Sequence, residues 1–201
     1  MRAMDELFGN WGLPEGAPLC GLDEAGRGPL AGPVTAAAVI LPENFPEGVL
    51  ADSKALPERR REEAFGLIVS GALAWSIAWA WPSEIDSINI LEASMLAMRR
   101  AFAGLDPAAL PPGLHAVVDG NRLPGLPVPT IALVKADAKV PAVMAASILA
   151  KVARDRAMER WDALYPDYGY ARHKGYPTAA HRAACRRLGP SPIQRLSFIF
   201  K

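Results

Sequence analysis

A strict alternation of side-chain size marks residues 74–81 as a β-strand. Tryptophan or isoleucine occupies every second position, and alanine or serine occupies the positions between them. Successive side chains of a strand point to opposite faces of a sheet, so the pattern predicts one bulky and one close-packed face. The tryptophans are therefore interpreted as residues that cover the sheet, and no role in stacking on bases is assigned to them.

Four other apolar runs have the length of strands, and three longer segments have helical spacing. The runs are residues 19–23, 34–41, 114–118 and 128–134, and the first two are expected to form a hairpin. The predicted helices are residues 57–72, 88–102 and 140–164. The elements run strand, strand, helix, strand, helix, strand, strand, helix, followed by a C-terminal helical region. This order predicts an α/β fold, with a mixed five-stranded sheet flanked by helices.

The composition bounds the class of protein. The chain has 201 residues, 51% of them hydrophobic, which is enough for the core of one domain. We expect an irregular leader over residues 1–17 and a single catalytic domain over residues 18–201 that includes the C-terminal helical extension. With 22 Lys and Arg against 21 Asp and Glu, the formal net charge is +1, so any contact with a nucleic acid must come from a local patch.

Targeting and redox signals are weak. Two cysteines are too few for a disulfide framework, which favours a reducing compartment. The first residues lack the basic start and continuous apolar stretch of a secretory signal, and no window approaches the ~18 apolar residues of a membrane span. We therefore expect a cytoplasmic protein, and a monomer by default.

Acidic residues follow three of the predicted strands. Asp23 closes the first strand with Glu24 beside it, Asp119 closes the fourth, and Asp137 lies between the last strand and the helix after it. Open sheets commonly place their sites at such strand ends. Because adjacent strand residues point to opposite faces, Asp23 and Glu24 could share a site only if the strand ends between them, as the small residues that follow allow.

Each acid also has a structural explanation. Asp119-Gly120 is a common turn, an adjacent acidic pair is common on surfaces, and Asp137 could cap the helix that follows it. Pro141 weakens the last explanation, because a proline at the first helical position makes Val140 the cap residue.

Taken together, the acids favour a metal site. Clustered carboxylates repel one another unless a cation neutralises them. Oxygen ligands without histidine or cysteine favour Mg²⁺ or Mn²⁺ over zinc. Two such ions could bridge a scissile phosphate, so the pattern predicts phosphodiester hydrolysis.

Two glycines flank a single arginine directly after the acidic pair, in the segment Gly26-Arg27-Gly28. Glycine permits close approach of the backbone, and arginine can grip a phosphate. A flexible turn is the alternative interpretation. After an acidic pair at a strand end, backbone groups of this loop could reach a ribose 2′-hydroxyl.

The sequence resembles the type 2 ribonucleases H, prokaryotic ribonuclease HII, over roughly residues 19–200. The signature segment is GLDEAGRGPLAGPV at residues 21–34. Further matches follow in the family's order: Asp52-Ser53-Lys54 and residues 88–98, 118–121, 145–151 and 173–178. Several ordered motifs together are a strong signal, whereas any one would be modest.

The resemblance implies a ribonuclease H-like fold and cleavage of the RNA strand of RNA/DNA hybrids. It also implies cutting at single ribonucleotides embedded in duplex DNA, leaving 5′-phosphate and 3′-hydroxyl ends. The family's metal-binding and catalytic acids match Asp23, Glu24, Asp119 and Asp137. Its substrate-binding positions match Gly26, Arg27 and Gly28 of the ribose-sensing loop, Tyr176 beside the ribonucleotide, and the basic residues Lys54, Lys151 and Lys174.

Two features depart from the family or fall outside its motifs. Alanines flank Asp137 where the family leads us to expect glycine and serine, which leaves the fine positioning of that acid open. His173 and His181 lack a helical ligand spacing, so they are interpreted as substrate-adjacent or surface residues.

Other functions stay open from the residues alone. A proofreading-type exonuclease also uses four acids, but its first motif is Asp-x-Glu, whereas Asp23 and Glu24 are adjacent. A non-catalytic hybrid-binding module would tolerate the loss of an acid. The segment from Gln194 to Phe200 loosely resembles a peptide that binds a sliding clamp, and packing against the domain is the alternative.

Overall fold

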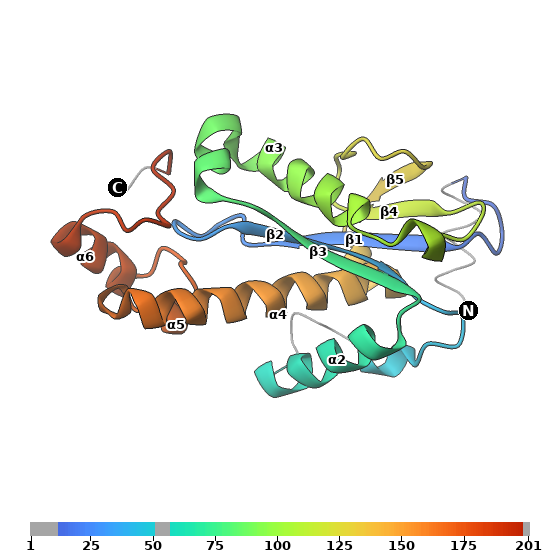
Figure 1. The fold of residues 1–201 in the computed structure, drawn as a ribbon, viewed down its shortest axis with the longest axis horizontal. Coiled ribbons are helices and arrows are strands. Elements are labelled where there is room, and N and C mark those ends of the chain that lie inside the picture. The colour runs from blue at the N-terminus through green and yellow to red at the C-terminus, as the bar shows by residue number, and fades with distance from the viewer. Residues whose placement is uncertain (1–11, 51–56, 199–201) are drawn as a thin grey trace.

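The computed structural model describes residues 12–50 and 57–198, in which five strands form one mixed sheet (Figure 1). The strand order is β3-β2-β1-β4-β5. The strands are β1 (Leu19–Ala25), β2 (Val34–Ile40), β3 (Ala74–Ala80), β4 (His115–Asp119) and β5 (Thr130–Leu133). β1, β2 and β3 pair antiparallel, whereas β4 runs parallel to both β1 and β5. The expected mixed five-stranded sheet is confirmed.

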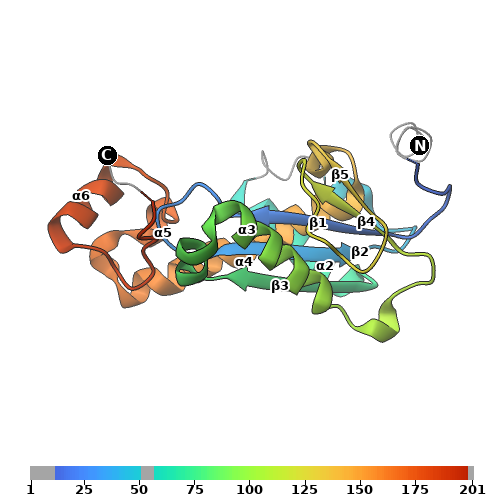
Figure 2. The same cartoon turned by 90° about the horizontal axis from the view of Figure 1, so that it is seen from above.

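Helices cover both faces of this sheet. α3 (Pro82–Ala103) lies on one face, and α4 (Pro141–Leu164) with α2 (Glu58–Gly71) lies on the other (Figure 1). α5 (Tyr170–His173), α6 (Ala179–Leu188) and the segment after them lie beyond the carboxyl end of β1 (Figure 2). The 3₁₀ turns are η1 (Glu47–Val49), η2 (Pro107–Ala109), η3 (Ala136–Ala138) and η4 (Pro166–Tyr168). The order of strands and helices expected from the sequence is therefore confirmed.

The second predicted helix begins earlier than the spacing indicated. α3 starts at Pro82, and Asn89 interrupts it with a non-helical φ of 67° and ψ of 167°. The Asn89 side-chain oxygen accepts hydrogen bonds from the backbone N–H groups of Leu91 (2.9 Å) and Glu92 (3.2 Å). Asn89 therefore caps the second part of the helix, whose first turn would otherwise lack partners for its N–H groups. The apolar spacing from position 88 detected only this second part.

Small residues let the helices pack closely on the two central strands. Every residue of β2 is buried, and alanines occupy its three middle positions. Gly21 of β1 lies directly under α4: a Cβ atom there would lie 2.1 Å from the carbonyl carbon of Ala142 and 2.2 Å from the nitrogen of Val143. α4 therefore lies against β1 more closely than any side chain at position 21 would permit.

The tryptophan face of the edge strand covers the sheet only in part. Trp75 is 38% exposed, and Trp81, just after β3, is 46% exposed. The rings of Trp79 and Trp81 stack with centroids 6.1 Å apart, and the Trp75 indole N–H donates to the Val69 carbonyl of α2. These contacts agree with the interpretation of the tryptophans as packing residues of an edge strand.

None of the helices within residues 12–50 and 57–198 combines the length and the apolar character that crossing a membrane requires.

Two glycine-to-alanine substitutions should shift the free energy of unfolding in opposite directions. We expect Gly21→Ala to destabilise the fold by about 3 kcal/mol or more, because the new methyl group would meet the backbone of α4. Gly66→Ala should stabilise it by about 1 kcal/mol, because Gly66 is an exposed position inside α2 with no neighbouring atom within 4 Å of a new Cβ. Urea unfolding of both variants measures the difference, and a Gly21→Ala variant as stable as wild type would contradict the close packing of α4 on β1.

Candidate active site

Parallel pairing of β1 with β4 brings two carboxylates side by side. Leu22 lies opposite Val118 in the register, so Asp23 and Asp119 are the next residues along their strands. Each acid lies two positions after a residue that faces α4, Gly21 in β1 and Val117 in β4, so both acids point to that same face of the sheet. The two carboxylates therefore meet at the carboxyl ends of neighbouring strands, on the face that α4 covers.

A short turn after β5 delivers the third acid. Lys135 takes a left-handed conformation with φ of 61°, and the 3₁₀ turn η3 that follows carries Asp137 at its centre. The buried Ala136 fixes this turn, since its backbone N–H donates to Asp119 Oδ1 at 2.8 Å. Carboxylate oxygens of Asp23, Asp119 and Asp137 all lie within 4.8 Å of one another.

Asp137 lies near the other two acids although alanines flank it where the family led us to expect glycine and serine. Ala136 is buried and Ala138 is exposed, and between them Asp137 places a carboxylate oxygen within 4.8 Å of those of Asp23 and Asp119. Val140 is the N-cap residue of α4, as Pro141 at the first helical position predicted, and Asp137 lies outside that helix. The explanation of Asp137 as the cap of α4 is therefore wrong.

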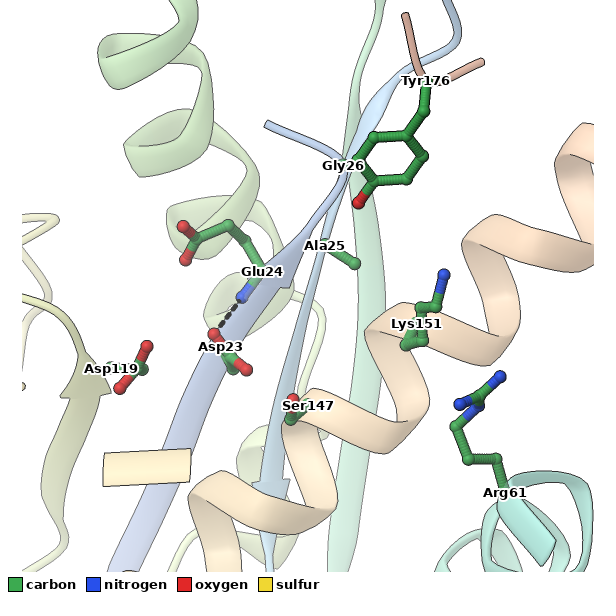
Figure 3. A pocket seen from close by; sticks show the side chains of 9 residues that line it. All are labelled: Asp23, Glu24, Ala25, Gly26, Arg61, Asp119, Ser147, Lys151 and Tyr176. Carbon is green, nitrogen blue, oxygen red and sulfur yellow. Dashed lines mark hydrogen bonds between the residues drawn. The ribbon is translucent and has the colours of Figure 1, made fainter. Parts of the chain in front are cut away.

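Glu24 reaches the site from the opposite face of the sheet. The condition set for a shared site, that β1 ends between Asp23 and Glu24, is not met, because the strand and its pairing with β2 continue to Ala25; both residues nevertheless line one cavity. The Glu24 side chain therefore points away from that of Asp23 (Figure 3) and is outside the group of three acids. Its Oε1 pairs with Arg27 Nη1 at 3.3 Å, and its backbone N–H donates to Asp23 Oδ1 at 2.7 Å.

Burial makes the charge of the acid cluster costly. Desolvation raises the pKa of Asp23 well above its ordinary value; the negative charges of Glu24 and Asp119 raise it further, and a hydrogen bond from Ser147 opposes the rise. Desolvation also raises the pKa of Glu24, against the opposing effect of Arg27. A bound cation would relieve this repulsion, and a set of carboxylate oxygens fits a hard divalent ion.

A cavity of about 410 Å³ opens over these acids (Figure 3). Its lining includes Asp23, Glu24 and Asp119 together with cations from two helices, Arg61 of α2 and Lys151 of α4. Ser147 of α4 also lines it. The sequence interpretation assigned no role to Arg61 or Ser147. Position 147 lies inside a family motif and one helical turn before Lys151, which was a usable signal, whereas α2 offered only a charged surface pattern.

The glycine-arginine-glycine loop and the tyrosine lie at one end of the same cavity. Gly26 has a φ of +95°, and a Cβ atom there would lie 2.0 Å from Nε of Arg154, so only glycine fits. Tyr176 is 43% exposed, and its ring lies 3.7 Å from the position of a Cβ atom on Gly28. Gly26 and Tyr176 both line the cavity that Asp23, Glu24 and Asp119 line.

The three lysines expected to bind substrate differ in their placement. Lys151 lines the cavity and pairs with Asp155 one turn along α4, at 2.9 Å. Lys174 pairs with Glu159 of α4 at 2.6 Å and is not among the residues that line the cavity. Lys54 lies outside the described residues.

The histidine pair is part of the structure beneath Tyr176. The interpretation as surface residues is wrong, because His173 and His181 are 8% and 0% exposed. Their rings stack with centroids 4.4 Å apart. His181 Nδ1 lies 2.9 Å from the Tyr176 carbonyl oxygen, so this nitrogen carries the proton and donates. The pair supports the backbone of the tyrosine.

Comparisons with known proteins agree with this geometry. A family model described as Ribonuclease HII matches residues 20–201. A ribonuclease HII from Laribacter hongkongensis (strain HLHK9) is 58% identical over 182 residues, which are 90% of this chain and 90% of that protein. The ribonuclease H2 from Pyrococcus horikoshii OT3 superposes with a TM-score of 0.74 at 29% identity, over 90% of this chain and 94% of that chain. The RNase HII of Archaeoglobus fulgidus, solved as a complex with PCNA, superposes with a TM-score of 0.72 at 26% identity, over 92% and 96% of the two chains.

Fold and site together define a metal-dependent nuclease of ribonuclease H-like architecture. The chain belongs to the ribonuclease HII family, as its ordered motifs indicated. The resemblance found in the sequence is confirmed.

Removing one charge of the cluster should stabilise the metal-free protein. The pKa of Asp23 is higher in the folded protein than in the unfolded chain, so at pH values between the two the folded state binds more protons. The free energy of unfolding therefore falls as the pH rises from about 4 through the raised pKa. With EDTA at pH 8, we expect Asp23→Asn to raise the melting temperature by about 2–4 °C, the shift that about 1 kcal/mol produces in a chain of this size.

Two controls accompany this measurement. The difference in melting temperature should disappear near pH 4, where the side chain at position 23 is neutral in both folded proteins. It should shrink in Mg²⁺, because a cation that binds the folded wild-type protein raises the melting temperature of that protein. An Asp23→Asn variant that melts at or below the wild-type temperature in EDTA at pH 8 would contradict the repulsion.

Proposed function

We propose that this chain is an endoribonuclease that hydrolyses the RNA strand of RNA/DNA hybrids and cuts at single ribonucleotides embedded in duplex DNA. The observation that carries the proposal is the shared cavity: Asp23 and Asp119 line it together with Gly26 and Tyr176. A hydrolytic centre and a group of residues suited to contact a ribose thus border one space. The products are expected to carry 5′-phosphate and 3′-hydroxyl ends.

Asp23, Asp119 and Asp137 are proposed to hold the metal, and Glu24 to complete the site from the other face of β1. Their oxygens suit Mg²⁺ or Mn²⁺, and the spacing of three carboxylates within 4.8 Å fits a shared ion. When bound, two such ions supply an activated water and stabilise the charge that develops on the leaving oxygen. Ser147 lines the cavity with Asp23 and lowers the pKa of that carboxyl, and it is proposed to hold the carboxylate in its orientation.

Cationic side chains around the cavity are proposed to hold the nucleic-acid backbone. Arg61 and Lys151 line the side of the cavity formed by α2 and α4, and Arg27 is half exposed beside Glu24. Phosphate contacts of this kind position a duplex without reading its sequence. Tyr176 offers a ring face for the sugar at the loop end of the cavity. Lys54 and Lys174 stay predictions as phosphate contacts.

The two competing functions account for fewer observations. An exonuclease with four acids does not require a glycine-rich loop and an exposed tyrosine at the end of the same cavity. A binding module without catalysis has no need for buried carboxylates whose mutual repulsion raises the pKa of Asp23. Both alternatives are separated from the proposal by the test of the acids below.

A partnership with a sliding clamp is a further prediction, as are the monomeric state and the cytoplasmic location. The Archaeoglobus fulgidus relative was solved with PCNA, which supports the idea for the family. In this chain, however, Gln194 is 3% exposed and its amide donates to the Leu30 carbonyl at 2.7 Å. A clamp that reads the segment from Gln194 to Phe200 would have to release this bond, whereas Leu196, which is 68% exposed, is accessible.

Neutralising any one of the three clustered acids should abolish cutting. We expect Asp23→Asn, Asp119→Asn and Asp137→Asn each to lower kcat by at least about 100-fold on a duplex that contains one ribonucleotide, in Mg²⁺. Asp106→Asn is the matched control, because Asp106 caps the distant turn η2 and should leave the rate unchanged. Denaturing gels of end-labelled duplex report both the rate and the position of the cut.

The same gels contain the outcomes that oppose the proposal. Absence of a cut at the ribonucleotide by the wild-type chain would sink it, and so would undiminished cutting by any of the three acid variants. Degradation from a duplex end would favour the exonuclease.

A further inference from the structure

Two arginines are buried behind the glycine-rich loop. Arg154 of α4 is 1% exposed and Arg195 of the C-terminal segment is 0% exposed. Within residues 12–50 and 57–198, neither forms an ion pair. Desolvation lowers the pKa of Arg154 to about 10 and that of Arg195 to about 9. Burial of a guanidinium group without a carboxylate partner is costly unless other acceptors satisfy its donors.

Among the described residues, every hydrogen bond of these two guanidinium groups goes to a backbone carbonyl. The Arg195 donors reach the carbonyl oxygens of Gly32 (2.8 Å), Arg27 (2.9 Å) and Gly26 (2.5 Å). The Arg154 donors reach the carbonyl oxygens of Pro33 (3.1 Å), Ala31 (3.1 Å) and Lys174 (3.0 Å). Arg195 therefore holds the tip of the loop, and Arg154 joins its base to the segment that carries Tyr176.

The contacts of Arg195 decide which way the loop's N–H groups point. In a trans peptide the C=O and the following N–H point in opposite directions. Because the carbonyls of Gly26 and Arg27 point inward to Arg195, the N–H groups of Arg27 and Gly28 point away from it. Both residues are exposed, and neither N–H donates to an acceptor in the part of the chain that the structure describes. The loop thus presents two free donors beside the ring of Tyr176.

The backbone around Arg195 is itself fixed. Its N–H donates to the Leu30 carbonyl at 2.9 Å, and the Gly32 N–H donates to the Ile193 carbonyl at 2.8 Å. On the other side, the carboxylate of Asp86 at the start of α3 accepts from the N–H groups of Leu196 (2.9 Å) and Ser197 (2.8 Å). The C-terminal segment is therefore hydrogen-bonded to the glycine-rich loop through Arg195, and Asp86 binds the two residues of the segment that follow Arg195.

We propose that Arg195 is a positioning residue for ribonucleotide selectivity, which orients the Arg27 and Gly28 N–H groups toward the 2′-hydroxyl of the substrate. The inference rests on the proposed function. It assigns to the C-terminal segment a role in substrate choice that acts through the loop and involves no direct contact of Arg195 with substrate. A guanidinium is required there because its planar fork reaches three carbonyls at once, whereas a lysine ammonium is a point charge on a flexible stem.

The test separates the reading of the ribose from general binding of the duplex. For Arg195→Lys we expect kcat/KM on a duplex with one ribonucleotide to fall about 10-fold to 100-fold, as small displacements in a site can cause. The inhibition constant of an all-DNA duplex of the same sequence, which offers phosphates without a 2′-hydroxyl, should change by less than about 2-fold. The matched control is Arg99→Lys, because Arg99 also donates to a carbonyl, that of Pro124 at 3.0 Å, away from the cavity. This control should leave both values unchanged.

The results that overturn the inference differ from the result that overturns the proposed function. Unchanged kcat/KM in a folded Arg195→Lys variant overturns the inference, and so does an equal loss of ribonucleotide cutting and all-DNA binding at a wild-type melting temperature. If that variant fails to fold, Asp86→Ala decides, since it frees only donors on two exposed residues, the N–H groups of Leu196 and Ser197 and the Ser197 hydroxyl. We then expect kcat/KM to fall about 3-fold with the inhibition constant unchanged, and no change overturns the inference. A wild-type chain that does not cut at the ribonucleotide is instead the failure of the proposed function, and the inference falls with it.

Discussion

The parallel pairing of β1 with β4 is the interaction on which the rest of the site depends. It places Asp23 and Asp119 at the carboxyl ends of adjacent strands, and Asp119 in turn accepts the Ala136 N–H that fixes the turn of Asp137. α4 covers the face of the sheet on which these two acids lie, and the bare Cα of Gly21 permits its close approach. One chain of contacts, from a glycine under a helix to a turn after the last strand, thus assembles three acids that are far apart in the sequence.

α4 joins this acid cluster to the loop that is proposed to read the sugar. Ser147, Lys151 and Arg154 follow each other at intervals of four and three residues, so they lie along one face of the helix. The first two line the cavity with Asp23, and the third holds the base of the glycine-rich loop. A rigid helix therefore sets the distance between the hydrolytic centre and the ribose-reading loop. The repulsion of the acids is the cost of this arrangement, as is common where function requires like charges to lie together.

Local patterns predicted most of the fold and brought the right acids into view. Strand alternation, apolar spacing and the position of Pro141 depend on short-range physics, and each led to the element that the structure contains. The errors arose where distant segments decide the outcome. Continuation of β1 through Glu24 depends on its pairing with β2, and the capping role of Asn89 depends on where the chain turns after β3.

The buried arginines show the same limit most clearly. No local pattern distinguishes Arg154 or Arg195 from a solvated surface arginine, because five of their six carbonyl partners lie more than a hundred residues away in the sequence. Burial of His173 and His181 likewise depends on the packing of α5 and α6. Family motifs identified the loop and the tyrosine, but only the fold reveals which side chains hold them in place.

The most direct measurement of the central claim is anomalous diffraction from crystals of this chain grown in Mn²⁺. The claim that the three acids form one metal centre predicts a manganese peak within coordination distance of carboxylate oxygens from Asp23, Asp119 and Asp137. A cluster without a peak at saturating Mn²⁺, or manganese bound only at other carboxylates, would contradict it.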